Sequence, residues 1–370
     1  MVLPFEAKTP DACHKPRNAT KILSALLGWY FTEKRNLPWR KAPTPYRIWI
    51  SEIMLQQTQV KTVIPYYERF LQKFPDLSAL AAADEEEVLR LWAGLGYYHR
   101  ARNLLKTARM VHAKYGKFPE EFAVIRTLPG IGEYTAGAIC SIALHQSYPA
   151  VDGNVKRILT RLDAICDKVS EDFFRKRAYA LLSDGDAASF NQALMDLGAL
   201  VCTPKQPQCG LCPIAEFCAA EKLGMQNDLP SKKATPKLVT LAIVLLVLEK
   251  NGVGGREILL RSAAKPDFIP GKWGLPCQEV PTVDSIAQTA IDLCRELRGA
   301  DIPLEHLQEF RHSITHHRIT AHLFHGRWDD STLPRLCAEN CKWVMWESAE
   351  KELLSSLFRK ALRFRQSGDD

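Results

Sequence analysis

The chain has 370 residues, of which 46% are hydrophobic and 25% charged, which suits about two globular domains with a substantial core. Its formal net charge of +7 is compatible with a nucleic-acid partner, although such a charge is common in other proteins. No stretch reaches the roughly 20 apolar residues of a membrane span, and residues 1–21 lack a signal-peptide core, so we expect a cytoplasmic protein. In that reducing compartment, the 11 cysteines should be metal ligands or buried residues rather than disulfides.

Helical spacing dominates the chain from Thr20 to Gly224. Segments such as KILSALLGWYFTE, EEEVLRLWAGL and ARNLLKTARMVHAKY repeat apolar residues at intervals of three and four, which predicts amphipathic helices. The composition then changes, because GMQNDLPSKKATPK over residues 224–237 is polar, basic and contains two prolines, as in an interdomain linker. We therefore expect one domain over residues 1–225, a linker over 226–237 and a second domain over 238–370.

The second domain has a different hydrophobic period. The runs LVTLAIVLLVLEK and REILLRSA flank NGVGG, which predicts a β-hairpin. The run SITHHRITAHLFHGRW alternates like another pair of strands. Two helical runs, near residues 284–298 and 349–365, complete a smaller unit. The expected fold is a mainly α domain followed by an α+β domain.

Four cysteines lie close together at the end of the helical region. Cys202, Cys209, Cys212 and Cys218 follow the spacing C-x6-C-x2-C-x5-C, so that four thiolates in one loop can surround one metal centre. Thiolates bind both zinc and iron–sulfur clusters, and the ligand set alone does not separate the two. Structural zinc usually takes two short pairs of ligands, whereas only one pair is short here.

The stretch LPGIGEYTAGAI, residues 128–139, predicts a tight turn at Gly130 and Gly132 that leads into a helix. A short helix-like stretch precedes it and no lysine follows the second glycine, so it fits neither a dinucleotide fingerprint nor a P-loop. Two glycines let main-chain N–H groups point outward, and the helix N-terminus that follows favours an anion. Such a hairpin can hold a polymer phosphate whatever the sequence, unless it is only a turn between two helices.

Two carboxylates flank this turn in the sequence. Asp152 precedes a helix in PAVDGNVKRILTR, where its ordinary role is an N-cap, but a carboxylate fixed there could also stabilise a developing cation. Glu52 lies in YRIWISEIMLQQTQV, on a helix whose apolar face includes Trp49, Ile50 and Ile53. Glu52 is either a plain solvent-facing residue or, if buried, an acid of raised pKa that can donate a proton at neutral pH.

Together, the stretches SEIMLQQTQV, WAGLGYYHRARNL, LPGIGEYTAGAI, VDGNVKR and the four-cysteine loop resemble the helix–hairpin–helix DNA glycosylases, and among these the adenine DNA glycosylases of the MutY group. The resemblance is specific over residues 20–225 and weaker over the second domain. It implies a base excision repair enzyme with one 4Fe–4S cluster that removes adenine mispaired with 8-oxoguanine or guanine in double-stranded DNA. We expect a monomer without membrane association, located on the bacterial nucleoid when bound to DNA.

The resemblance also implies roles for individual residues. Glu52 matches the general acid that protonates adenine at N7 once the base is flipped out of the duplex, and Asp152 matches the carboxylate that stabilises or briefly bonds to the oxocarbenium ion. Tyr134 and Asn154 match residues that position this site. The expected DNA contacts are Leu55, Gln57, Tyr97, Gly130 and Gly132, with Tyr98 as an adjacent candidate, and the expected cluster ligands are Cys202, Cys209, Cys212 and Cys218.

Tyr134 stands where the endonuclease III relatives carry a lysine nucleophile, and Glu133 before it is no amine. Without that amine no Schiff base forms, so we expect a monofunctional glycosylase with little strand nicking. One alternative is an enzyme of the same fold that acts on oxidised pyrimidines, which Tyr134 and the second domain oppose. The other is a binding protein that senses damage without cleavage, which would require the loss of Glu52 or Asp152.

The second domain resembles a Nudix fold, which in this family reads the 8-oxoguanine opposite the adenine. Its region DSIAQTAIDLCRELRGA offers only Arg295 and Glu296 of the R-E-x-x-E-E magnesium constellation, so we expect no pyrophosphate hydrolysis. Ile314-Thr315-His316 matches the family's lesion-reading loop, which is usually Phe-Ser-His. Thr315 keeps a hydroxyl and His316 keeps the imidazole, whereas the aromatic ring is lost; the alternative is that these are ordinary strand residues.

Overall fold

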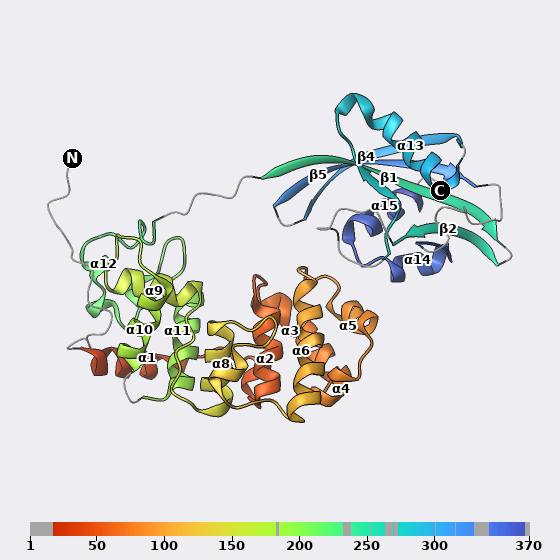
Figure 1. The fold of residues 1–370 in the computed structure, drawn as a ribbon. Coiled ribbons are helices and arrows are strands. Elements are labelled where there is room, and N and C mark those ends of the chain that lie inside the picture. Colours follow the sequence, from red (N-terminus) through yellow and green to blue (C-terminus); the bar gives the residue numbers. More distant parts are fainter. Residues whose placement is uncertain are drawn as a thin grey trace. The chain divides into compact units, whose positions relative to one another are not determined.

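The computed structural model describes residues 18–182, 185–231, 238–252, 254–262, 269, 273–299, 301–314, 316–328 and 340–366. The chain divides into two compact units, Met1–Leu91 with His99–Ala234 and Trp92–Tyr98 with Thr235–Asp370. The first unit is helical, and the second combines a sheet with helices (Figure 1). This confirms the expected mainly α domain followed by an α+β domain. The predicted linker boundaries stay a prediction.

Polar residues set the starts of several helices in the first unit. The side chains of Thr44, Asp76, Asp152 and Asp186 each accept a hydrogen bond from a main-chain N–H in the first turn that follows. The helices are α1 (Ala19–Glu33), α2 (Pro45–Leu55), α3 (Val60–Lys73), α4 (Leu77–Ala81), α5 (Glu85–Trp92), α6 (His99–Tyr115), α7 (Phe122–Ile125), α8 (Glu133–Leu144), α9 (Gly153–Leu162), α10 (Glu171–Leu182), α11 (Ala187–Leu200) and α12 (Ala219–Lys222).

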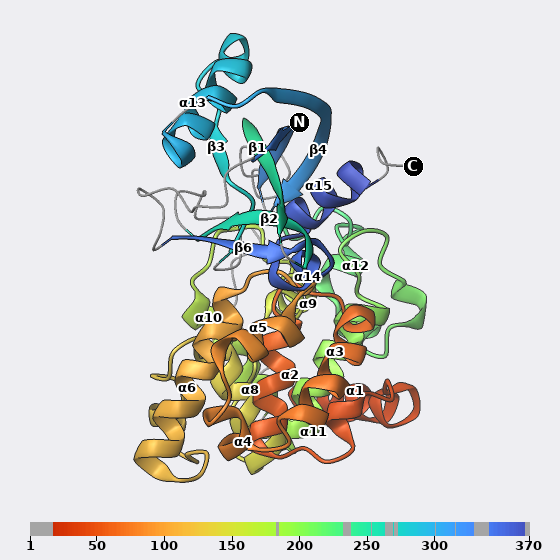
Figure 2. The same cartoon turned by 90° about the vertical axis from the view of Figure 1, so that its right-hand side faces the viewer.

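Helix α8 connects two groups of helices within this unit. Helices α1, α9, α10 and α11 surround an apolar core that includes Leu26, Leu159 and Phe190. Helix α2 packs against α3, α6 and α8, and α8 also packs against α11. Figures 1 and 2 both show α2 and α8 side by side in the middle of the unit. Residues at the start of α8 can therefore reach side chains of both groups.

The second unit is built on a mixed sheet. Its strands are β1 (Val239–Gly252), β2 (Gly255–Arg261), β3 (Cys277–Glu279), β4 (Leu304–Ile314), β5 (His317–Arg327) and β6 (Cys341–Met345), in the order β4-β5-β1-β2-β6, with β3 paired to β1. Strands β1 and β5 are parallel and the other pairs are antiparallel. The predicted hairpin around NGVGG is confirmed as β1–β2, and the second predicted pair corresponds to β4–β5.

Both faces of this sheet are covered. Alternate residues of β1 point to opposite sides, as the period of two requires, so Leu245 and Leu246 belong to different cores. The Leu245 side packs with Phe358 of α15 (Ser356–Gln366) and with α14 (Trp346–Glu352), and the Leu246 side packs with α13 (Ile286–Arg298). Figure 1 shows α13 on one side of the sheet and α14 and α15 on the other.

The structure divides one predicted helix and describes one end of the expected linker. The single helical run expected near residues 349–365 is two helices, because Leu353 is extended and buried and Ser355 Oγ accepts a hydrogen bond from Leu357 N at the start of α15. In the segment expected to be a linker, Leu229 is buried beside Ala164 and Ala220. This end of the segment therefore packs as part of the helical unit.

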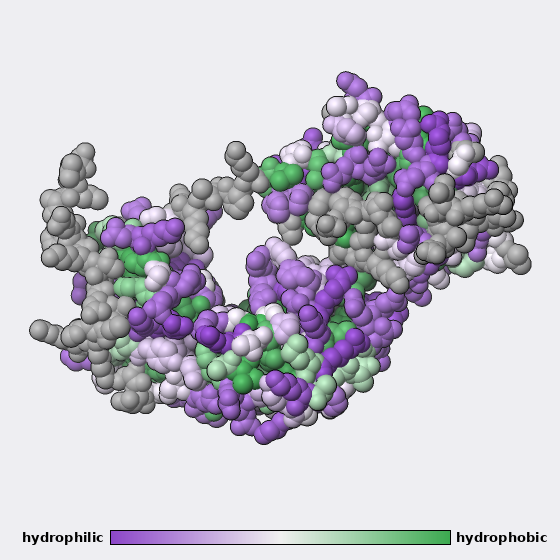
Figure 3. Space-filling model, in the orientation of Figure 1, coloured by the Kyte–Doolittle hydropathy of each residue, from purple (hydrophilic) through white to green (hydrophobic). Residues whose placement is uncertain are grey.

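The visible surface is mostly hydrophilic, with apolar side chains exposed in places (Figure 3). Within the described part of the chain, no helix combines the length and apolar character that crossing a membrane requires.

We predict that Gly137→Ala destabilises the protein, although alanine normally favours helices. A Cβ at Gly137, inside α8, would lie 2.5 Å from the carbonyl oxygen of Pro149, so the loop that leads to Asp152 would have to move. We expect a loss of about 2 kcal/mol in the free energy of unfolding, measured by urea titration. The matched control is Gly28→Ala in α1, where a Cβ meets nothing within 4 Å and a gain of about 0.5–1 kcal/mol is expected. A neutral or stabilising Gly137→Ala would contradict the prediction.

Candidate active site

Glu52 is a buried carboxyl on α2. The helix begins at Pro45 after the Thr44 cap, and its residues from Ile48 to Met54 are all buried, so Glu52 is only 3% exposed. The Tyr134 hydroxyl donates a 2.6 Å hydrogen bond to Glu52 Oε2. Burial raises the pKa of Glu52 to about 7; the Tyr134 hydrogen bond lowers it, the charge of Asp152 raises it and Arg40 lowers it. Glu52 is thus partly protonated at neutral pH, the buried alternative of the sequence analysis.

Tyr134 lies in the first turn of α8, directly after the glycine turn. Gly130 has a φ of 78° and Gly132 is extended as the N-cap of α8, so the chain runs as helix, turn and helix, as predicted. Burial, with Glu52 and Asp152 nearby, raises the pKa of Tyr134 well above its ordinary value, so its hydroxyl remains a donor. That bond occupies one oxygen of Glu52 and leaves Oε1 for a proton to be transferred.

Asp152 caps α9 and has both carboxylate oxygens engaged. Oδ1 accepts a hydrogen bond of 2.8 Å from Val155 N, and Oδ2 accepts one of 2.8 Å from Asn154 Nδ2. The expected N-cap role is therefore real, and the same two donors fix the carboxylate close enough to Glu52 for its charge to raise the pKa of that residue. The structure brings together Glu52, Tyr134, Asp152 and Asn154, which come from α2, α8 and the start of α9.

The loop that leads to Asp152 is tied down from α11. Asn191 is fully buried; its Oδ1 accepts a 2.9 Å hydrogen bond from Ala150 N, and its Nδ2 donates to Tyr148 O and to Ser141 Oγ. One side chain thereby fixes the loop against α8 two residues before Asp152. Sequence reasoning missed Asn191, because its partners lie more than 40 residues away in the chain.

A charged cluster also lies near Glu52. Asp196 on α11 is fully buried and pairs with Arg35 at 2.6 Å and with Arg40 at 2.8 Å. Burial raises the pKa of Asp196, but the two guanidinium groups together hold it below its ordinary value. Arg40 in turn lowers the pKa of Glu52. This cluster, also missed from the sequence, supplies fixed charges near Glu52.

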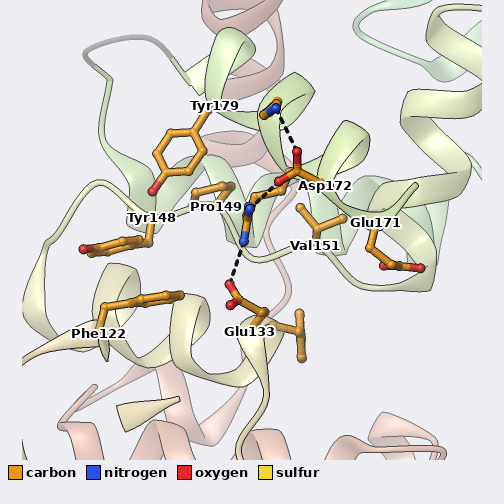
Figure 4. Close-up of a pocket in the computed structure, with 11 residues that line it drawn as sticks. Phe122, Glu133, Tyr148, Pro149, Val151, Glu171, Asp172 and Tyr179 are labelled. Carbon is orange, nitrogen blue, oxygen red and sulfur yellow. Dashed lines mark hydrogen bonds and ion pairs between the residues drawn. The ribbon is translucent and has the colours of Figure 1, made fainter. Parts of the chain in front are cut away.

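A cavity of about 600 Å³ lies beside these residues (Figure 4). Tyr134 and Val151, the neighbours of the two carboxyl groups, form part of its wall, while Glu52 and Asp152 are not among its described lining residues. The rings of Phe122 and Tyr148 stack with centroids 4.3 Å apart and form another part of the wall. Arg175 forms ion pairs with both Glu133 and Asp172, two labelled residues of the wall in Figure 4.

The four predicted cysteine ligands line one small cavity at the end of α11. Cys202, Cys209, Cys212 and Cys218 all contribute to its wall. Burial, together with the charges of the other three thiols, raises the pKa of Cys212 to about 12, so the set favours a cationic centre that would stabilise four thiolates. The donor set and its shared cavity therefore fit an iron–sulfur cluster, whose contribution when bound is to hold this loop together.

Helix α9 joins the cysteine loop to the carboxylate. Arg157 donates to Asn154 Oδ1 at 2.8 Å and to Cys202 O at 2.9 Å. Arg161 donates to Cys202 Sγ at 3.3 Å and to Thr203 O at 2.7 Å. The hydrogen bonds thus run from the Asp152 carboxylate through Asn154 and Arg157 to the first cysteine. Both arginines lie in the segment PAVDGNVKRILTR, but sequence spacing alone does not indicate their hydrogen-bond partners.

Two of the expected DNA contacts have unusual backbone conformations. Gln57 and Tyr97 have φ values of 54° and 49°, a left-handed conformation that is uncommon outside glycine and often marks functional segments. Gln57 is exposed and Leu55 half-buried at the end of α2. In the second unit His316 directly precedes β5, with its ring centroid 4.1 Å from that of His317, whereas Thr315 lies outside the described residues. The roles of these residues stay predictions.

Comparison with known proteins identifies the class first. Residues 50–181 match the family described as "HhH-GPD superfamily base excision DNA repair protein", and residues 202–218 match the "Iron-sulfur binding domain of endonuclease III". A solved thermostable thymine-DNA glycosylase is similar over 56% of this chain and 98% of its own, with a TM-score of 0.52 and 28% identity. The chain therefore has the fold of a DNA glycosylase and an iron–sulfur binding domain.

Curated relatives narrow the class. The adenine DNA glycosylase of Rattus norvegicus is 34% identical over an alignment of 404 positions, gaps included, that covers 94% of this chain and 78% of the relative. The adenine DNA glycosylase of Arabidopsis thaliana is 38% identical over an alignment of 392 positions, gaps included. This alignment covers 91% of this chain and 62% of the relative, so this chain spans about three fifths of the length of the Arabidopsis protein. The chain belongs to the adenine DNA glycosylase family, which confirms the resemblance drawn from the sequence.

We predict that Glu52→Gln changes how stability depends on pH. The folded pKa of about 7 lies above the ordinary value of 4.5, so the stability contributed by the neutral carboxyl is complete below pH 4.5 and is lost as the pH rises through 7. The amide stays neutral, so we expect the variant to gain about 3 kcal/mol over wild type at pH 9 and nothing near pH 4.5. Urea unfolding across this range measures the difference. The exposed Glu121→Gln is the control, and a pH-independent difference for Glu52→Gln would contradict the assignment.

We predict that Cys212→Ala prevents loading of the iron–sulfur cluster and lowers stability, because metal binding is coupled to folding of the ligand loop. Iron and sulfide analysis with visible absorbance measures loading, and thermal unfolding measures stability. Cys166→Ala, which removes an exposed thiol outside the ligand set, is expected to leave both unchanged. Full loading of Cys212→Ala would show that this thiol is not a ligand.

Proposed function

We propose that this protein is a monofunctional adenine DNA glycosylase that hydrolyses the N-glycosidic bond of adenine mispaired with 8-oxoguanine or guanine and leaves an abasic site. The observation that carries the proposal is the buried Glu52, which has a pKa of about 7, keeps an oxygen, Oε1, that Tyr134 does not bind, and lies close to the fixed carboxylate of Asp152. Membership of the adenine DNA glycosylase family supports the same reaction.

The two carboxyl groups suit two successive steps. Glu52 Oε1 would give its proton to N7 of the extruded adenine, so the bond between C1′ and N9 breaks with its electrons on a neutral purine. The carboxylate of Asp152, held by Val155 N and Asn154 Nδ2, would stabilise the positive sugar that remains. Water then adds to C1′, and the proton that it loses passes to the Glu52 carboxylate, which regenerates the acid.

DNA would be held by the main chain more than by side chains. The turn at Gly130 and Gly132 directs the N-terminus of α8, a helix of 12 residues, outward, where N–H groups and the helix dipole favour a phosphate. The neighbouring Leu55 and Gln57 would enter the stack as the adenine leaves it. A backbone grip suits an enzyme that must act at mispairs in any sequence.

The remaining expectations complete the proposal. We propose that the four thiolates of this loop hold a 4Fe–4S cluster, in which each of the four irons takes one cysteine. The connection between β4 and β5, with Thr315 and His316, would read 8-oxoguanine on the opposite strand. We also propose a monomer that acts on double-stranded DNA in the cytoplasm, without a membrane partner.

We predict that the protein releases adenine from a duplex with adenine opposite 8-oxoguanine, and that Glu52→Gln slows this at least about 100-fold through loss of the proton donor. Asp152→Asn should cause a similar loss of rate, because a neutral amide does not stabilise the positive sugar as a carboxylate does. Single-turnover release of labelled adenine measures both. For wild type, the rate should fall as the pH rises above about 7, because the acid form of Glu52 is required.

The control variant Glu121→Gln should keep the wild-type rate, and borohydride should trap little covalent adduct, since Tyr134 cannot form a Schiff base. Wild-type rates in either carboxyl variant would refute the site. Abundant trapped adduct, or release of oxidised pyrimidines instead of adenine, would favour an endonuclease III type of activity.

A further inference from the structure

Arg100 is a buried arginine that the proposed chemistry does not use. It lies in the first turn of α6 and is 4% exposed. Its Nη1 donates to three main-chain carbonyls, those of Ile53 at 2.9 Å, Met54 at 3.0 Å and Gln56 at 2.5 Å. Its Nη2 donates to Thr58 Oγ1 at 3.2 Å. All four acceptors belong to the last turn of α2 and the segment after it.

This contact closes the C-terminal end of α2. The last carbonyls of a helix have no partners within the helix and carry a partial negative charge, which a cation in this position satisfies. The planar guanidinium can serve several acceptors at once, which a lysine ammonium on a flexible stem does less well. Residues 56–58 leave the helix here, with Gln57 in the left-handed conformation, so Arg100 holds a segment whose backbone is under local strain.

The same helix also contacts the glycine turn. Thr107 Oγ1 donates to Pro129 O at 2.9 Å, and Asn103 lies so close to Gly130 that a Cβ there would be 3.0 Å from it. Gln56, Arg100, Asn103 and Gly130 together line a small cavity of about 70 Å³. Helix α6 is therefore in contact with both the segment after α2 and the phosphate-binding turn.

We propose that Arg100 is a positioning residue for opening the DNA stack, and that it holds Leu55 and Gln57 at a fixed distance from the phosphate grip at Gly130. This inference rests on the proposed function, because it concerns how the adenine leaves the duplex. If Leu55 and Gln57 are loosely held, ordering them on insertion into the stack costs part of the free energy that insertion gains. If they lie on a rigid support, this cost is avoided. Removing Arg100 should slow extrusion of a stacked adenine and spare the chemistry of an adenine that is already unstacked.

The test compares two duplexes in single-turnover release of adenine by the iron–sulfur-loaded, full-length protein. In one, adenine is opposite 8-oxoguanine; in the other, it is opposite a tetrahydrofuran abasic-site analogue, where it has no pairing partner. For Arg100→Met we expect a rate about tenfold or more lower on the first duplex and within about threefold of wild type on the second. Fluorescence of 2-aminopurine in place of the adenine should show a matching loss of unstacking.

Arg109→Met is the matched control. Arg109 lies on the same helix but donates to the Ala81 and Ala83 carbonyls at the end of α4 instead of to the segment after α2. Because Arg109 is exposed, its loss should cost less thermal stability than Arg100→Met, and the ratio of the rates on the two duplexes should stay that of wild type. Thermal unfolding of each variant separates a loss of fold from a loss of positioning.

Milder variants keep the inference testable if Arg100→Met does not fold. Thr58→Val removes only the hydroxyl that accepts from Arg100 Nη2. Arg100→Lys keeps the positive charge but loses the planar guanidinium. Both variants should show a smaller loss of rate that is again confined to the duplex with 8-oxoguanine. Equal losses on the two duplexes, or the same selective loss in Arg109→Met, would overturn the positioning role while leaving the proposed function intact. A wild type that releases adenine from neither duplex would refute the proposed function and this inference with it.

Discussion

The hydrogen bond between Tyr134 and Glu52 is the interaction on which the rest of the site depends. It joins α8 to α2 inside the protein and consumes one oxygen of a carboxyl group that burial has already made hard to ionise. A buried polar group is tolerated only when it is paired, so the tyrosine both satisfies the acid and directs its other oxygen. The burial that raises the pKa of Glu52 to about 7 also makes the folded protein less stable at high pH.

Asp152, unlike Glu52, accepts hydrogen bonds with both of its carboxylate oxygens because of its place in the chain. It stands outside α9, where the first N–H groups of the helix need acceptors, and its side chain supplies one. Asn154 engages the second oxygen, and Asn191 fixes the loop before it. One carboxyl group is thus enclosed by apolar residues, whereas the other accepts two hydrogen bonds, so two residues of similar chemistry have different surroundings.

The sequence predicted features that arise from local pattern and missed those that arise from distant contacts. The cap at Asp152, the turn at Gly130 and the β1–β2 hairpin depend on neighbouring residues, and each is present. The burial of Glu52 could not be decided, because it depends on every helix packed around α2. Arg100 contacts residues more than 40 positions away, and the break at Leu353 depends on a core that forms only when the sheet is assembled. Thr315, the residue expected to read the lesion, lies outside the described residues, so its role stays a prediction.

The position of α9 links the cysteine loop to the site carboxylate. Arg157 and Arg161 anchor the cysteine loop to the helix that Asp152 caps. Loss of the iron–sulfur centre that this loop would hold would free the anchorage and, through Arg157 and Asn154, loosen the Asp152 carboxylate. A change in the metal content of the protein is therefore expected to alter the geometry around Asp152.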